Sequence, residues 1–160
     1  MENLIKSTYK KWKAAKQYAA NRCRRALPDL ADQLDNCKMF TGNESLEELA
    51  DLMFQPQGRE FMLANQFPSL HTFRKYKIYN PEELGVYIDC GNITLTNPGR
   101  CFIIGNTRAE IFINSTDSHN VVVMHGATAN VYCSGYSVTK VEADRKSHVT
   151  TSAKDHAHVS

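Results

Sequence analysis

The residues whose types and spacing most clearly suggest a binding function are the cations near the start of the chain. Basic side chains neutralise phosphates and release counterions, and interleaved aromatic rings can stack on bases. Tyr9, Trp12 and Tyr18 provide such rings. The stretch therefore indicates a surface for nucleic acid or for a protein partner, although it contains no known recognition motif. Its cations are Lys6, Lys10, Lys11, Lys13, Lys16, Arg22, Arg24 and Arg25.

Two other interpretations of the same stretch stay open. In one, Tyr9 and Trp12 pack on the protein body and the lysines are solvated. In the other, the basic helix docks on the acidic segment that follows it. Residues 1–28 hold eight lysines and arginines against Glu2 alone, a net charge of +7. Residues 29–55 hold seven acids against Lys38, a net charge of −6, so the overall charge of +2 hides a strong segregation.

Histidines near the C-terminus are the second candidate for chemistry. His156 and His158 would share one face of an extended strand, and two such histidines can bind a metal. A catalytic metal also needs a third ligand, which His148 would supply only if neighbouring segments stack in register, and a general base. We therefore predict solvated histidines and no metal site, and keep a metal-dependent enzyme as the least favoured functional alternative.

The five cysteines argue against a disulfide framework or a structural zinc site, because they are odd in number and include no Cys-x-x-Cys. Cys101 and Cys133 are expected to be small buried hydrophobic residues. Cys90 stands at a corner without an identifiable histidine partner. The sequence also lacks a phosphate-binding loop, a dinucleotide-binding glycine pattern and a nucleophile elbow. We predict no catalytic residue, no cofactor and no enzyme.

Helices are expected to carry the candidate cations. Ile5, Tyr9 and Trp12 follow a 3.6-residue period. Ser45-Leu46-Glu47-Glu48 forms a capping box, in which the serine hydroxyl and the Glu48 carboxylate each accept from the other residue's amide. The first expected helix covers residues 3–26, and a short second one, which Pro28 can begin, contains Leu30, Ala31 and Leu34 and stops before Gly42. A third runs through residues 46–54, and two more begin at Pro56 and after Ser69.

Beyond Gly85 the pattern changes to short β-branched segments that recur at a near-constant step of about eight to ten residues. Glycine and asparagine mark the corners between them, since both tolerate positive φ. The spacing predicts a short parallel β-solenoid with one strand per segment. The residues that anchor the segments are Ile93, Ile103, Ile111, Val121, Val131, Val141, Val149 and Val159.

An antiparallel jelly roll is the alternative, because it also gives a strand every eight to ten residues. The solenoid is favoured because the late segments each place a small residue or threonine two positions before a valine, as in Ala129-Asn130-Val131 and Ala157-His158-Val159. We therefore predict an α+β protein, with a helical region at residues 1–83 and a β-solenoid at residues 84–160.

The runs GVYIDCGNITLTNPGRCFIIGNT and VVVMHGATANVYCSGYSVTKVEA resemble a group of small, uncharacterised bacterial proteins, often of mobile-element or phage origin. Those proteins join a helical N-terminal region to a short β-solenoid, and the resemblance covers roughly residues 55–145. It implies a fold and brings no catalytic residues. This chain departs from the group because it stops at Ser160 inside a repeat, without an apolar closing strand.

The sequence thus predicts a non-enzymatic protein-interaction or inhibitory protein, and the resemblance implies an antagonist of a host system. A nucleic-acid-binding accessory protein is the alternative. No stretch approaches the roughly 18 apolar residues of a membrane span. The basic start of the chain also lacks the apolar core of a signal peptide. The expected location is the cytoplasm, with no membrane contact.

The last segments predict a homo-oligomer, most simply a two-fold dimer. A final parallel strand exposes unpaired N–H and C=O groups, and such edges are capped, frayed or paired with another subunit. Protonation of the nearby histidines at about pH 6 would weaken the contact. The residues expected at this interface are His148, Val149, His156, Ala157, His158 and Val159.

Overall fold

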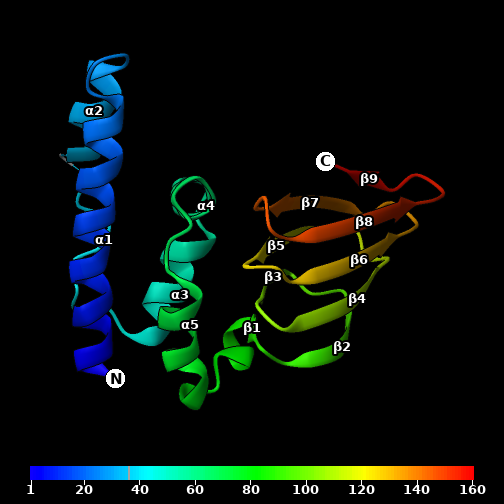
Figure 1. Cartoon of the computed structure of the whole chain (residues 1–160). Coiled ribbons are helices and arrows are strands. Elements are labelled where there is room, and N and C mark those ends of the chain that lie inside the picture. Colours follow the sequence, from blue (N-terminus) through cyan, green and yellow to red (C-terminus); the bar gives the residue numbers. More distant parts are fainter. Residues whose placement is uncertain (36) are drawn as a thin grey trace. The chain divides into compact units, whose positions relative to one another are not determined.

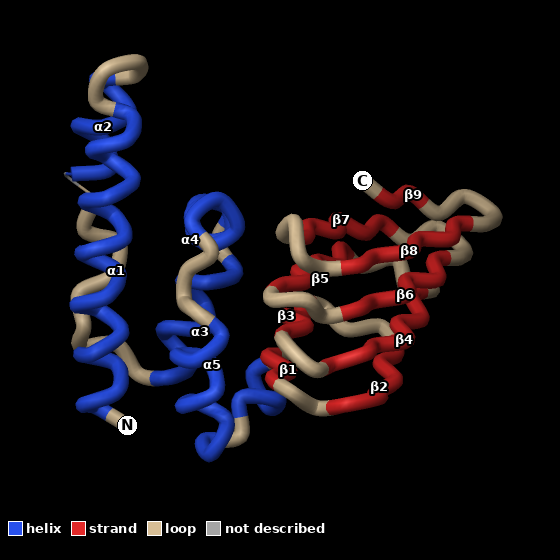
Figure 2. The backbone as a smooth tube through the Cα atoms, viewed as in Figure 1, coloured by secondary structure: helices blue, strands red, loops and turns tan. Residues whose placement is uncertain are grey.

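The computed structural model describes residues 1–35 and 37–160. The chain forms two compact units, Met1–Thr72 and Phe73–Ser160. The first is helical and the second contains the strands (Figure 1, Figure 2). The predicted boundary after residue 83 lies inside the 3₁₀ helix η2 (Pro81–Leu84), which precedes strand β1 (Val86–Ile88). The boundary between the two compact units comes earlier in the chain, after Thr72.

The structure contains the five α-helices that the sequence predicts. Prolines begin two of them, as expected where a fixed φ suits the first helical turn and no N–H partner is needed. Helices α1 and α2 pack against each other within the first unit. The helices are α1 (Glu2–Cys23), α2 (Pro28–Asp35), α3 (Leu46–Phe54), α4 (Pro56–Asn65) and α5 (Leu70–Tyr76), and a short 3₁₀ helix η1 (Lys77–Tyr79) follows them.

The predicted capping box is present at the start of α3. The Glu48 N–H donates to Ser45 Oγ at 3.1 Å, and the Ser45 N–H donates to Glu48 Oε1 at 3.5 Å. These two bonds satisfy amides that have no partner inside the helix. The cap therefore fixes the first residue of α3.

A Ser45→Ala variant is expected to lose about 1 kcal/mol of unfolding free energy, because the Glu48 amide loses its acceptor. Urea unfolding followed by helical circular dichroism measures the loss. Thr116→Ala, at an exposed corner of the solenoid, is a control expected to stay within about 0.5 kcal/mol of the wild type. Equal losses in the two variants would contradict the capping role.

The strands form two parallel sheets that face each other as walls of a solenoid of about four turns. Every pairing is parallel, which confirms the predicted solenoid and excludes the jelly roll. Sheet A contains β1, β3 (Arg100–Ile104), β5 (Ser118–Met124), β7 (Val138–Ala143) and β9 (His158–Val159). Sheet B contains β2 (Gly91–Thr96), β4 (Thr107–Ile113), β6 (Thr128–Cys133) and β8 (His148–Ala153).

Side chains inside the solenoid become smaller along its axis. The inward residues of the middle turns, such as Ile111 and Val131, are almost fully buried. Turns with small inward side chains enclose little volume, as the sequence pattern predicts. One in-register column runs Tyr87, Ile103, Val123, Ala143, and another runs Leu95, Ile111, Val131, Thr151.

Asparagine and aspartate side chains link successive turns at the corners. Asn97 Oδ1 accepts hydrogen bonds from the N–H groups of Asn114 at 2.7 Å and Ser115 at 3.1 Å. Asp89 Oδ1 accepts from the Asn106 N–H at 2.8 Å. Asn97 and Asp89 have φ of 49° and 50°, a conformation that these two residue types adopt more readily than most. The corner residues thus serve both to turn the chain and to join the turns.

Candidate functional site

Three of the candidate cations in α1 are directed to partners within the helical unit. Lys11 Nζ donates to Thr72 Oγ1 at 3.1 Å, Lys16 Nζ donates to the Cys37 carbonyl at 2.8 Å, and Arg22 Nη2 donates to Asn65 Oδ1 at 3.2 Å. These bonds connect α1 to residues far along the chain. Lys11, Lys16 and Arg22 therefore help to hold the helical unit together.

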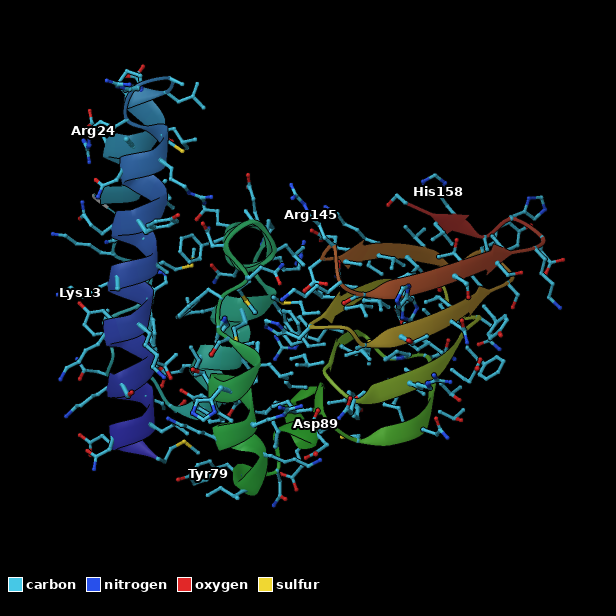
Figure 3. The ribbon with its side chains drawn as sticks, viewed as in Figure 1. Lys13, Arg24, Tyr79, Asp89, Arg145 and His158 are labelled. Carbon is cyan, nitrogen blue, oxygen red and sulfur yellow. The ribbon has the colours of Figure 1, made fainter. Side chains whose placement is uncertain are left out.

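The other five cations, Lys6, Lys10, Lys13, Arg24 and Arg25, are exposed. Figure 3 shows Lys13 and Arg24 on the outer side of α1. Lys6 pairs with Glu2 at 2.9 Å, and the lysine lowers the pKa of that carboxyl through a hydrogen bond and its charge. Arg24 lies 3.8 Å from Asp32, an ion pair with the acidic segment. Exposed pairs of this kind contribute little stability and exchange readily for other anions.

Two of the three aromatic residues of α1 pack on other rings of the helical unit and are not available to stack on bases. Trp12 is buried, and its ring centroid lies 5.8 Å from that of Phe40 in an edge-on arrangement. Tyr9 meets the same Phe40 ring at 5.5 Å. Tyr18 is exposed, but the Arg22 guanidinium lies over its ring at 5.0 Å. Packing on the protein body is therefore the interpretation that the structure supports for Tyr9 and Trp12.

An aromatic patch that the sequence analysis missed lies on the solenoid, where sheet B strands end and the chain turns into sheet A. Phe112 and Tyr132 are in-register partners on the outer face of sheet B, stacked with centroids 5.1 Å apart. At the next corner Tyr136 stacks on His156 at 4.7 Å. Val138 follows at the start of β7. The exposed fractions of Phe112, Tyr132, Tyr136 and Val138 are 45%, 41%, 67% and 49%.

Hydrogen-bonded polar side chains flank this aromatic patch on sheet B. Asn130 Nδ2 donates to Glu110 Oε1 at 2.9 Å, and Thr150 Oγ1 donates to Asn130 Oδ1 at 2.5 Å. A hydrogen bond to Glu110 also raises the pKa of Tyr132. The bonds run from turn to turn across the sheet. They restrict the rotamers of the flanking side chains, so the surface is ordered before anything binds to it.

The three C-terminal histidines lie on different parts of the solenoid. His148 begins β8 on sheet B, His156 stacks on Tyr136 at a corner, and His158, labelled in Figure 3, begins β9 on sheet A. Among residues 1–35 and 37–160, no three His, Cys, Asp or Glu side chains gather as a metal site would require. The structure thus does not bring the predicted candidate ligands together.

The residues predicted for an oligomer interface all belong to the last turn. Val149, Ala157 and Val159 are partly buried against the interior cluster, whereas His148, His156 and His158 are exposed. Their role in self-association stays a prediction.

The cysteines are free thiols, and two of them are buried as predicted. Burial raises the pKa of the Cys101 thiol to about 12, so this group stays protonated at neutral pH. The Cys90 pKa is also raised, first by burial and then by the hydrogen bond that its thiol donates to Glu82. A protonated thiol is a poor nucleophile. Neither environment favours covalent chemistry.

Comparisons of the chain with protein-family models, curated proteins and solved structures give no match. Within the described residues, no helix combines the length and apolar character needed to cross a membrane.

Proposed function

We propose that this is a non-enzymatic binding protein that engages a protein partner through the aromatic patch of its solenoid. The observation that carries the proposal is the stacked, exposed pair of Phe112 and Tyr132 on sheet B. Exposed Tyr136 and Val138 follow Tyr132 along the chain, at the corner after β6 and at the start of β7. Aromatic residues are enriched at the buried centres of protein interfaces and dominate their energetics. An exposed apolar cluster within a polar surround is the usual mark of such a surface.

The solenoid supports this role because it presents the patch on a rigid sheet. Phe112 and Tyr132 alternate with fully buried core residues such as Ile111 and Val131. Their backbones are therefore fixed by the interior, and each ring is braced by the other. Binding on such a surface costs little conformational entropy, which favours affinity. We further propose that this binding inhibits the partner, which is what the sequence resemblance to mobile-element proteins implies.

The test is affinity capture with immobilised wild type and a Phe112→Ser/Tyr132→Ser variant, in lysate of the organism that encodes the protein. A specific partner should bind the wild type stoichiometrically, and the variant should bind it at least tenfold more weakly, since one hot-spot aromatic residue contributes about 2 kcal/mol or more. Surface plasmon resonance with the purified partner then gives both affinities.

Tyr18→Ser is the matched control, because Tyr18 is likewise an exposed aromatic residue but lies in the helical unit. Its partner binding should equal that of the wild type. Circular dichroism must show that all three proteins are folded. A partner retained by the Phe112→Ser/Tyr132→Ser protein, or lost equally in the Tyr18→Ser protein, would refute the patch as the binding surface.

A further inference from the structure

Four exposed cations, three in α1 and one at its C-terminal cap, lie in a stripe along one side of the helix. Lys6, Lys10, Lys13 and Arg24 are spaced so that a helix of 3.6 residues per turn places them on the same side. Measured from Lys6 to Arg24 at the helical rise of about 1.5 Å per residue, the stripe is roughly 27 Å long. Between its two ends, α1 contains no acidic residue.

Neutral hydrogen-bonding groups occupy the same side of the helix. Gln17 and Asn21 lie between Lys13 and Arg24, are exposed, and bond to each other at 3.2 Å. Amide side chains of this kind contact phosphate oxygens in nucleic-acid complexes. The stripe therefore presents cations and neutral donors together. The helix sequence between Lys6 and Arg24 contains no carboxylate that would compete with a phosphate.

A long row of cations is complementary to an extended polyanion. Duplex nucleic acid is such a polyanion, with one negative charge per roughly 1.7 Å of its axis. Binding to single strands relies instead on aromatic rings on which unpaired bases stack. Here Tyr9 and Trp12 pack on Phe40, which leaves Tyr18 as the one exposed ring of α1, with Arg22 over one of its faces. The stripe can therefore bind mainly through the phosphate backbone, and phosphate contacts do not require unpaired bases.

We propose that the stripe of Lys6, Lys10, Lys13 and Arg24 binds double-stranded nucleic acid through its phosphates, independently of sequence. This site is separate from the aromatic patch, and its failure would leave the proposed protein-binding function intact. The pairs of Lys6 with Glu2 and of Arg24 with Asp32 are exposed. They yield to phosphate at small cost.

The experiment measures fluorescence anisotropy of a labelled 20-base-pair DNA duplex of arbitrary sequence, at 50 and 200 mM salt. With four phosphates neutralised, wild-type affinity should fall about a hundredfold over this range. A Lys6→Gln/Lys10→Gln/Lys13→Gln variant should bind more weakly at 50 mM salt and lose only about threefold in affinity over the same range. A second duplex of unrelated sequence should bind the wild type equally well.

Arg145→Gln/Lys146→Gln/Lys154→Gln is the matched control, because it removes three exposed cations from the solenoid and changes the net charge equally. It should bind like the wild type. All substituted positions are exposed, and circular dichroism confirms folding. The proposal is overturned if the duplex does not bind, if both triple variants lose affinity equally, or if a single strand of the same length binds more tightly than the duplex.

Discussion

A Val121→Asp variant is expected to lose most of the stability of the solenoid. Val121 is fully buried inside β5, in register with Cys101 on one side and Val141 on the other. An aspartate there removes apolar burial and places a carboxylate without a partner in the interior, at a cost of at least about 4 kcal/mol. This is comparable with the roughly 5–15 kcal/mol that stabilises a typical domain.

The same substitution at Val141 provides the comparison. Val141 points inward one turn later but is only partly buried. The carboxylate of a Val141→Asp variant stays closer to water and should cost about half as much. Urea unfolding followed by β-sheet circular dichroism measures both variants. Equal losses of unfolding free energy in the two variants would show that water is excluded from the last turns as well as from the middle ones. That result would contradict the partial exposure of Val141 in the structure.

The solenoid could be predicted because one sequence period sets both strand length and corner position. From β4 onward successive turns are equal in length, since Arg108 pairs with Thr128 and Thr128 pairs with His148. The first turn is shorter, as the pairing of Gly91 with Thr107 shows. Strand β1 lies in this shorter turn. A search for a constant step therefore missed β1, although its apolar residues immediately follow Gly85.

The candidate site was predictable only in part, because residue type does not say which way a side chain points. The eight cations of the first helix are evident in the sequence, but the partners of Lys11 and Arg22 are 61 and 43 residues away. Such distant contacts depend on how the helices pack. Phe112 and Tyr132 were missed for another reason: aromatic residues in strands are usually counted as core. Their alternation with Ile111 and Val131 was the available signal.

Asp144→Ala is expected to be the most damaging change at a corner of the solenoid. Asp144 is a buried residue with 7% of its surface exposed. It accepts hydrogen bonds from the His125 N–H at 2.8 Å, the Lys146 N–H at 3.1 Å and the Ser147 hydroxyl at 2.6 Å. Alanine removes this acceptor, for a loss of about 2–4 kcal/mol of unfolding free energy.

Asp155→Ala is the matched control one corner later, where an exposed carboxylate accepts from the Gly135 N–H at 3.2 Å. It should lose less than about 1 kcal/mol.

The Asp144 carboxyl should also give the solenoid a characteristic acid sensitivity. Burial alone would raise its pKa, but the bonds from His125, Ser147 and Lys146 outweigh burial and lower it. A group with a lowered pKa in the folded state stabilises the fold above its ordinary pKa, near 3.9, and loses that contribution as the pH falls through the folded value. Wild-type stability should therefore fall between about pH 5 and pH 2 by more than that of Asp144→Asn, which has no proton to gain. Urea unfolding at several pH values measures the pH dependence of stability for both proteins. Parallel curves for the wild type and Asp144→Asn would show that the hydrogen bonds do not favour the ionised carboxyl.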